Sequence, residues 1–218
     1  MSTRWSFVAA TLLLLLASLA HPVAAQGGRA DPRLEARLDG TTRAAVAAIV
    51  DSARAGGLPT EPLVQKALEG ASRQAEPARI AQAVRSLAER LGRARDALGA
   101  RSSEAELVAG AGALYLGVTP ATLRRLRAEQ RGGTVALPLV VLSDIMERGV
   151  PRDTASSVII ALAGARVPDG AYATLRESVA RDIRAGAPPA AAASTRAQGI
   201  LVGREPAPPP PVRRPRSP

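Results

Sequence analysis

The chain of 218 residues contains no cysteine and one histidine, His21. Without cysteine it can form neither a disulfide bond nor a thiol-linked lipid anchor. The histidine lies in an N-terminal segment that we expect to be removed. The mature chain would then lack the residues on which Cys-His and Ser-His-Asp nucleophile systems and most zinc sites depend. The sequence therefore predicts no cofactor, no metal site and no catalytic residue of these kinds.

Aromatic residues are also scarce, with one Trp, one Phe and two Tyr. Strands favour aromatic and β-branched residues, whereas Ala and Leu favour helix and small side chains let helices approach closely. Hydrophobic residues make up 46% of the chain, mostly Ala, Leu, Val and Ile. We therefore predict an all-α fold of eight or nine helices. Nucleic acid is not expected as a partner, because single strands stack on aromatic side chains that are scarce here.

The first 25 residues have the pattern of a secretory signal peptide. Arg4 gives a basic start, residues 7–20 are apolar, and the small residues at 23–25 fit a cleavage site before Gln26. An uncleaved anchor is the alternative, but the apolar run is shorter than the ~20 residues that a membrane-spanning helix needs. We expect a flexible N-terminus at residues 26–30 and a periplasmic or secreted protein.

A recurrent Gly-apolar-Pro junction, with one extra residue in its second copy, punctuates the chain after Gly57, Gly117, Gly149 and Gly186. Glycine can adopt the left-handed conformation that closes a helix, and proline suits the first turn of the next helix. Each junction therefore predicts a bend between two helices. The resulting helical hairpins should stack on one another, because none can bury its apolar face alone. The spacing is uneven, so an irregular α-solenoid and a multi-helix bundle both stay open.

We place the helical domain at residues 31–198, with a long helix from Pro77 as its spine. The apolar residues of that helix recur at spacings of three and four: Ile80, Val84, Leu87, Leu91, Ala94 and Leu98. A capping-box pattern, Ser103 with Glu106, predicts the start of the next helix. Its buried side should include Leu107, Val108, Ala111 and Leu114. Residues 199–218 are rich in Pro and Arg, which predicts a disordered basic tail with polyproline character.

Three groups of polar residues resemble parts of a catalytic or metal site: Glu177 beside Ser178, Asp144 with Glu147, and Lys66. A carboxylate can act as a general acid or base without histidine, paired carboxylates can bind a cation, and lysine can activate a serine. We favour a structural interpretation, in which helical spacing pairs these residues with neighbours: Glu177 with Arg181, Asp144 with Arg148, and Lys66 with Glu69.

The formal net charge is +10, and two groups of arginines are candidates for anion binding. The first group recurs about one turn apart with no local acid opposite, and the second lies in the tail: Arg124, Arg127 and Arg131, then Arg204, Arg213, Arg214 and Arg216. Such groups attract anions through long-range electrostatics. A merely solvated charged face is the alternative.

These features lead to the hypothesis of an exported, non-enzymatic interaction or structural protein of a bacterial-type cell envelope. Its partner would be a protein or an anionic envelope component, and a peripheral contact with the membrane is compatible with this. Two alternatives stay open: a carboxylate-dependent envelope hydrolase or lyase, and a peripheral binder of anionic lipid or polymer. A buried acid with a raised pKa in a cleft would favour the first, and an exposed arginine face the second. The sequence does not predict the oligomeric state.

Overall fold

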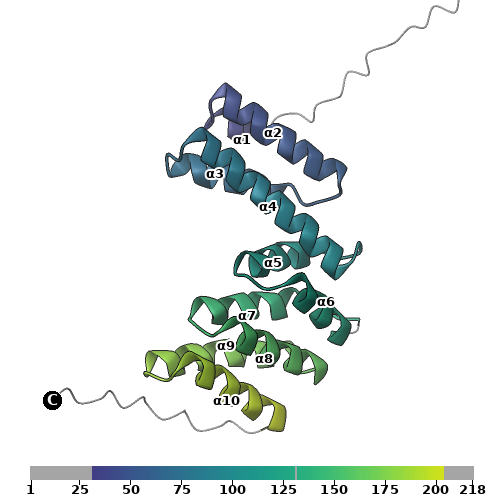
Figure 1. The fold of residues 1–218 in the computed structure, drawn as a ribbon, viewed down its shortest axis with the longest axis vertical. Helices are drawn as coiled ribbons and strands as arrows, with labels where there is room; N and C mark the ends of the chain where they lie inside the picture. The colour runs from purple at the N-terminus through teal and green to yellow at the C-terminus, as the bar shows by residue number, and fades with distance from the viewer. Residues whose placement is uncertain (1–30, 131, 204–218) are drawn as a thin grey trace, which may run out of the picture.

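The computed structural model describes residues 31–130 and 132–203, and in these ranges the chain forms ten helices stacked along one axis (Figure 1). In chain order they are α1 Pro32–Glu35, α2 Gly40–Ala55, α3 Glu61–Ser72, α4 Pro77–Leu98, α5 Glu104–Tyr115, α6 Pro120–Glu129, α7 Ala136–Glu147, α8 Arg152–Gly164, α9 Asp169–Arg184 and α10 Pro189–Val202. The predicted all-α class is confirmed. The described ranges hold ten helices, more than the eight or nine predicted.

Six interhelical turns share one backbone geometry. At the first, the N–H of Gly57 donates to the carbonyl of Arg54 and the N–H of Leu58 donates to the carbonyl of Ala53, both at 2.9 Å. This pattern closes a helix with a left-handed residue and satisfies its last carbonyls. The predicted left-handed glycines are confirmed, with φ of 68° at Gly57, 89° at Gly117, 92° at Gly149 and 94° at Gly186. The other two turns have Gln74 (φ 54°) and Arg166 (φ 53°) in this place.

The helices lie in two layers. In one layer α2, α4, α6, α8 and α10 follow one another, each packed on the next. In the other layer α5 packs on α7 and α7 on α9, with α3 before them. The layers meet where α3 and α5 pack on α4, α7 packs on α8, and α9 packs on α10. Most helices therefore contact helices one or two positions along the chain, as in an α-solenoid.

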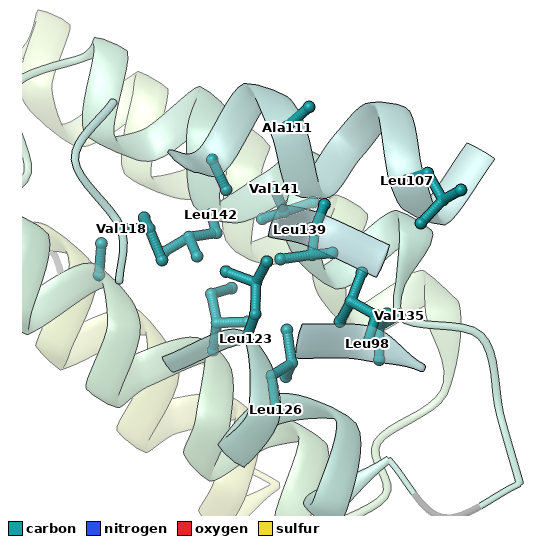
Figure 2. Close-up of a cluster of buried hydrophobic side chains, with 14 of the residues drawn as sticks. Leu98, Leu107, Ala111, Val118, Leu123, Leu126, Val135, Leu139, Val141 and Leu142 are labelled. Atoms are coloured by element: carbon teal, nitrogen blue, oxygen red, sulfur yellow. The ribbon is translucent and has the colours of Figure 1, made fainter. Parts of the chain in front are cut away.

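One hydrophobic core runs between the two layers. Figure 2 shows its central part, where apolar side chains of α4 to α7 and their connections converge: Leu98, Leu107, Ala111, Val118, Leu123, Leu126, Val135, Leu139, Val141 and Leu142. The predicted apolar seam of α4 is buried except for Leu87, which is partly buried. At the contact of α4 with α5, a Cβ atom on Gly110 would lie 3.1 Å from the Cβ of Ala94. Glycine at this position therefore allows the two helices to approach closely.

Two predictions about burial and boundaries are wrong. Val108 was expected on the buried side of α5 but is 41% exposed, because that side is centred on Leu107, Gly110 and Ala111. The helical domain also extends past its predicted end at Gln198. Residues 199–202 continue α10, since three of them are apolar, and Gly203 closes the helix with φ 72°.

The predicted signal peptide at 1–25, the flexible segment at 26–30 and most of the predicted tail lie outside the described residues. In the described ranges, no helix combines the length and the apolar character needed to cross a membrane.

Candidate interaction surfaces

Glu106 links the start of α5 to α6 and to the start of α7. Its carboxylate accepts hydrogen bonds from the N–H of Ser103 at 2.9 Å and from the N–H of Val135 at 3.0 Å. The hydroxyl of Ser103 accepts from the N–H of Glu106, so the predicted capping box is confirmed. The guanidinium of Arg127 completes the cluster, with 2.7 Å between Nη2 and the Glu106 carboxylate. Burial raises the pKa of Glu106, but the three donors together lower it to about 2.

This cluster changes the interpretation of the predicted arginine stripe. Arg127 is 28% exposed at its side chain, pairs with Glu106 and donates to the carbonyl of Gly133 at 3.1 Å. The acid comes from another helix, so the local sequence pattern, which shows no acid opposite Arg127, does not reveal this pair. Arg124 is exposed on the same helix. The other predicted anion-binding residues lie outside the described residues: Arg131, Arg204, Arg213, Arg214 and Arg216. Anion binding by the exposed arginines stays a prediction.

A cavity of about 390 Å³ lies beside this cluster, between the end of α4 and the start of α5. Its lining residues are Leu98, Gly99, Ala100, Arg101, Ser102, Glu106 and Arg127. Because Arg127 is already neutralised by Glu106, Arg101 is the remaining cation in the wall. The cavity can therefore attract a small anion only weakly.

A second surface is apolar and lies on the outer side of α5 and α7. The hydrogen bond between Glu106, in the first turn of α5, and Val135, at the N-cap of α7, places the starts of these packed helices side by side. Val108 and Val140 are each the fifth residue of their helix, and they are 41% and 42% exposed. Tyr115, two turns after Val108 on the same side of α5, is 73% exposed. We call Val108, Tyr115 and Val140 the α5–α7 face.

The ring of Tyr115 is held against α4. The guanidinium carbon of Arg90 lies 5.1 Å from the ring centroid, within the range of a cation–π contact. Burial and the neighbouring charge of Arg93 lower the pKa of Arg90. Tyr115 is the one exposed aromatic residue in the described ranges, since Tyr172 is 1% exposed. An ordered, exposed tyrosine is typical of the centre of a protein interface.

The residues that resembled a catalytic pair at 177–178 have a structural role. The hydroxyl of Ser178 donates to the carbonyls of Thr174 at 2.6 Å and Leu175 at 3.1 Å, both within α9. Glu177 is exposed one residue before it. Ser178 is 4% exposed and its hydroxyl proton is engaged with its own helix, so it is not positioned as a nucleophile.

Lys66 and Asp144, from the other two candidate groups, each form an ion pair. Lys66 pairs with Glu69 at 2.8 Å, as predicted. Asp144 pairs with Arg176 of α9 at 3.4 Å, so its predicted pairing with Arg148 is wrong. The packing of α7 on α9 brings Arg176 within reach, and helical spacing could not reveal this. In the part of the chain that the structure describes, no cluster of His, Cys, Asp and Glu could hold a metal ion.

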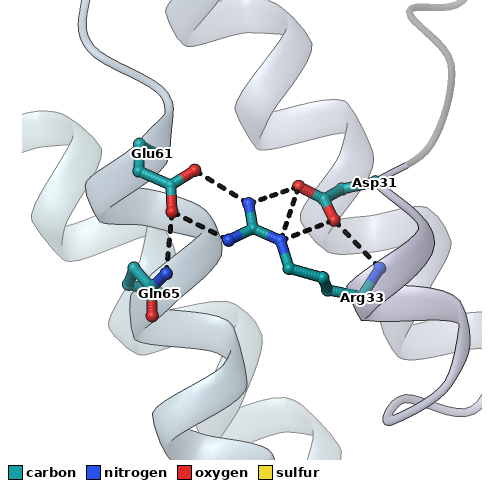
Figure 3. A network of polar contacts seen from close by, with 4 residues as sticks. All are labelled: Asp31, Arg33, Glu61 and Gln65. Atoms are coloured by element: carbon teal, nitrogen blue, oxygen red, sulfur yellow. Dashed lines mark hydrogen bonds and ion pairs between the residues drawn. The ribbon is translucent and has the colours of Figure 1, made fainter.

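Arg33 joins the N-terminal helices to α3 (Figure 3). Its guanidinium contacts Asp31 at 2.6 Å and Glu61 at 2.8 Å, and Gln65 donates to Glu61 at 2.7 Å. The hydrogen bonds from Arg33 and Gln65 lower the pKa of Glu61 to about 2. A small cavity of about 250 Å³ lies beside the network, with Asp51 and Glu61 in its wall. Because the network is exposed to solvent, it adds little stability.

A buried ion pair joins α9 to α10. Arg196 donates to both carboxylate oxygens of Asp182, at 2.7 and 2.9 Å. The two residues are 6% and 2% exposed. This bidentate geometry compensates part of the cost of burying both charges, and losing either partner would leave the other charge uncompensated. This pair could not be predicted from helical spacing, because its members lie on different helices.

Comparison of the chain with family models, with curated proteins and with solved structures finds no match. The functional argument therefore depends on the surfaces described above.

Proposed function

We propose that the protein is an exported, non-enzymatic interaction or structural protein of a bacterial-type cell envelope, and that it binds another protein through the α5–α7 face. The observation that carries the proposal is the exposure of that face. Of the five large apolar side chains that are exposed in the described ranges, three are Val108, Tyr115 and Val140 on two packed helices. Single exposed apolar residues are ordinary on a surface, whereas a cluster with an ordered tyrosine supports an interface. Export is inferred from the N-terminal sequence pattern.

The charges around the face favour an acidic partner. Arg90 covers one side of the Tyr115 ring. Two exposed charges affect the pKa of Arg90, the basic Arg93 and the acidic Glu89, so this edge keeps one net positive charge. A partner segment with apolar side chains and a nearby carboxylate would match both the valines and this basic edge. Opposite charges at the rim would raise the association rate and help to select the partner.

The two alternative functions differ in their support. A carboxylate hydrolase needs a general acid with a raised pKa. In the described ranges, every carboxylate pKa that departs clearly from its usual value is lowered, as at Glu106 and Glu61. A peripheral binder of anionic lipid or polymer keeps support from the net charge of +10 and from exposed arginines such as Arg124.

The test compares Val140→Arg with Leu201→Arg in the full chain, produced in its native host and captured after cross-linking. Leu201 is the matched control for Val140. Both side chains are 42% exposed, but Leu201 lies on α10, outside the α5–α7 face. We expect Val140→Arg to reduce the yield of a specific cross-linked protein at least ~10-fold, since an arginine would be desolvated in the contact. Leu201→Arg should leave that yield unchanged.

Circular dichroism of both purified variants provides the folding control. Equal yields of the same cross-linked proteins from Val140→Arg and from the wild type would refute binding through the α5–α7 face. The intact mass of the protein from the same cells reports separately on export, because signal-peptide cleavage removes residues 1–25.

A further inference from the structure

The start of α7 is bonded to a side chain of another helix. Its N-cap residue, Val135, is 0% exposed, so the backbone N–H of this residue is shielded from water. Glu106 of α5 supplies the acceptor, with 3.0 Å between the Val135 nitrogen and the carboxylate oxygen Oε1. Buried N–H groups are almost always hydrogen-bonded, because an unsatisfied one loses its bond to water without replacement. The buried start of α7 therefore depends on the Glu106 carboxylate.

The local sequence does little to fix this helix start. In the described ranges, each of the other nine helices has a side-chain cap at its N-cap residue, or a proline there or in its first two positions. α7 has neither, and the nearest hydroxyl, that of Thr134, accepts from the N–H of Ala136 at 3.2 Å. The connection before α7 contains Gly132 and Gly133, which restrict the backbone little. The start of α7 therefore relies more on contacts with other helices.

Arg127 of α6 provides a second contact with the same helix start. Its Nη1 donates to the carbonyl of Gly133 at 3.1 Å, and its Nη2 lies 2.7 Å from the Glu106 carboxylate. One ion pair therefore bonds both the carbonyl of Gly133 and the N–H of Val135, two backbone groups that flank a single residue. Glu106 is 5% exposed, and hydrogen bonds are stronger where water is excluded.

The same carboxylate also fixes the start of α5. Its Oε2 accepts from the N–H of Ser103, the N-cap residue of α5. Both helices of the α5–α7 face therefore have their first turn bonded to Glu106, and Val108 and Val140 follow as the fifth residue of each. Beneath the face the helices pack through apolar side chains such as Leu139. Apolar packing is non-directional, whereas a buried polar pair can fix the register of two helices.

We propose that the Glu106–Arg127 pair positions the α5–α7 face by fixing the start of α7 against α5 and α6. The inference rests on the proposed function of that face. Without the pair, the first turn of α7 opens locally and Val140 loses its fixed position relative to Val108, while the other helices keep their own caps and packing. A partner would then have to order this turn on binding, which weakens the complex.

Amide hydrogen exchange, measured by NMR on the mature chain of residues 26–218, tests the proposal without a partner. We expect Glu106→Gln to accelerate exchange at the N–H groups of Val135 and Leu139 at least ~10-fold beyond the acceleration of the slowest amides, which report global unfolding. Glutamine offers one acceptor oxygen, whereas Oε1 and Oε2 of the carboxylate accept from two different helix starts. A contact that only stabilises the fold would accelerate all these amides by the same factor, and that result would overturn the proposal.

Two further variants separate the pair from the capping box. Ser103→Ala removes the capping hydroxyl but leaves both carboxylate bonds in place, so exchange at Leu139 should stay within about 2-fold of the shared change. Arg127→Lys is the milder variant of the pair, for use if Glu106→Gln does not fold. It keeps the charge but loses the fork that reaches both the carboxylate and Gly133, and should accelerate exchange at Leu139 at least ~3-fold. Equal acceleration by Ser103→Ala and Arg127→Lys would contradict the positioning role.

Partner capture distinguishes this positioning role from the proposed function. Where circular dichroism shows that Glu106→Gln is folded, its yield of the specific cross-linked protein should fall at least ~3-fold, because ordering the first turn of α7 opposes binding. A wild-type yield from this folded variant would overturn the positioning role. An unchanged yield from Val140→Arg refutes the proposed function and leaves the exchange result standing. A reduced yield from Val140→Arg, without excess exchange at Leu139 in Glu106→Gln, refutes the positioning role alone.

Discussion

Arg166 and Gln74 occupy left-handed positions that glycine holds in the other four turns of the same geometry. A side chain with a Cβ atom is strained there by roughly 1–2 kcal/mol, whereas glycine is not. Both residues are exposed. In the described ranges, the charged side chain of Arg166 takes part in no ion pair. Replacing either with glycine should therefore relieve strain without removing a contact.

The expected change in the free energy of unfolding is the difference between two opposing effects. Relief of the left-handed conformation should stabilise the fold by about 1–2 kcal/mol, and the extra freedom of glycine in the unfolded chain should oppose this by about 0.4–1 kcal/mol. We expect Arg166→Gly to raise the free energy of unfolding by about 0.5–1 kcal/mol, which corresponds to about 1–4 °C in melting temperature for a domain of this size.

The assay is urea unfolding followed by circular dichroism, with Gly117→Ala and Gly149→Val as reciprocal variants. No atom lies within 4 Å of a Cβ placed on Gly117, and the nearest to one on Gly149 is Pro189 Cγ at 3.6 Å. Their cost, at least ~1 kcal/mol, would thus report backbone strain at φ of 89° and 92° rather than a clash of the new Cβ atom. An unchanged or lower midpoint for Arg166→Gly, together with unchanged midpoints for both reciprocal variants, would refute the reasoning.

Two further predictions concern charge. Glu106 has a folded-state pKa of about 2 against 4.5 for the unfolded chain, so its contribution is present above pH 4.5 and is lost as the pH falls through 2. Glu106→Gln should destabilise the fold by about 2–3 kcal/mol at pH 7 and by much less near pH 2. Urea titrations at both pH values measure this difference. Equal destabilisation at both pH values would contradict the lowered pKa of Glu106. The exposed arginines should bind anionic vesicles weakly and lose binding between ~50 and ~500 mM salt. Deleting residues 204–218 removes four arginines and one glutamate and should weaken vesicle binding without changing the circular dichroism, whereas salt-insensitive binding would point to an apolar contact.

The features that could be predicted from the sequence are those that one helix or one turn determines. The left-handed glycines and the seam of α4 follow from local spacing, and both are confirmed. Ser103 and Glu106 lie within one turn of each other, so their capping box could also be predicted.

The features that could not be predicted depend on the packing of different helices. Arg127 meets Glu106 across α5 and α6, and Arg196 meets Asp182 across α9 and α10. The sequence predicts Val108 in the core because α5 beyond its first turn carries no charged residue that would distinguish its outer side from its inner side. The α5–α7 face is therefore a surface that sequence periodicity describes poorly.

The restriction of most packing to helices one or two positions apart affects how the chain can fold. The side chain of Arg95 bonds the carbonyl of Gly56, and this contact spans only 39 positions of the chain. Short sequence separation keeps the entropy of loop closure small and favours rapid folding. Because synthesis proceeds from the N-terminus, α1 to α4 can consolidate while α9 and α10 are still unfolded. Each later helix would then add to a surface that is already formed, and α10 would complete the molecule last.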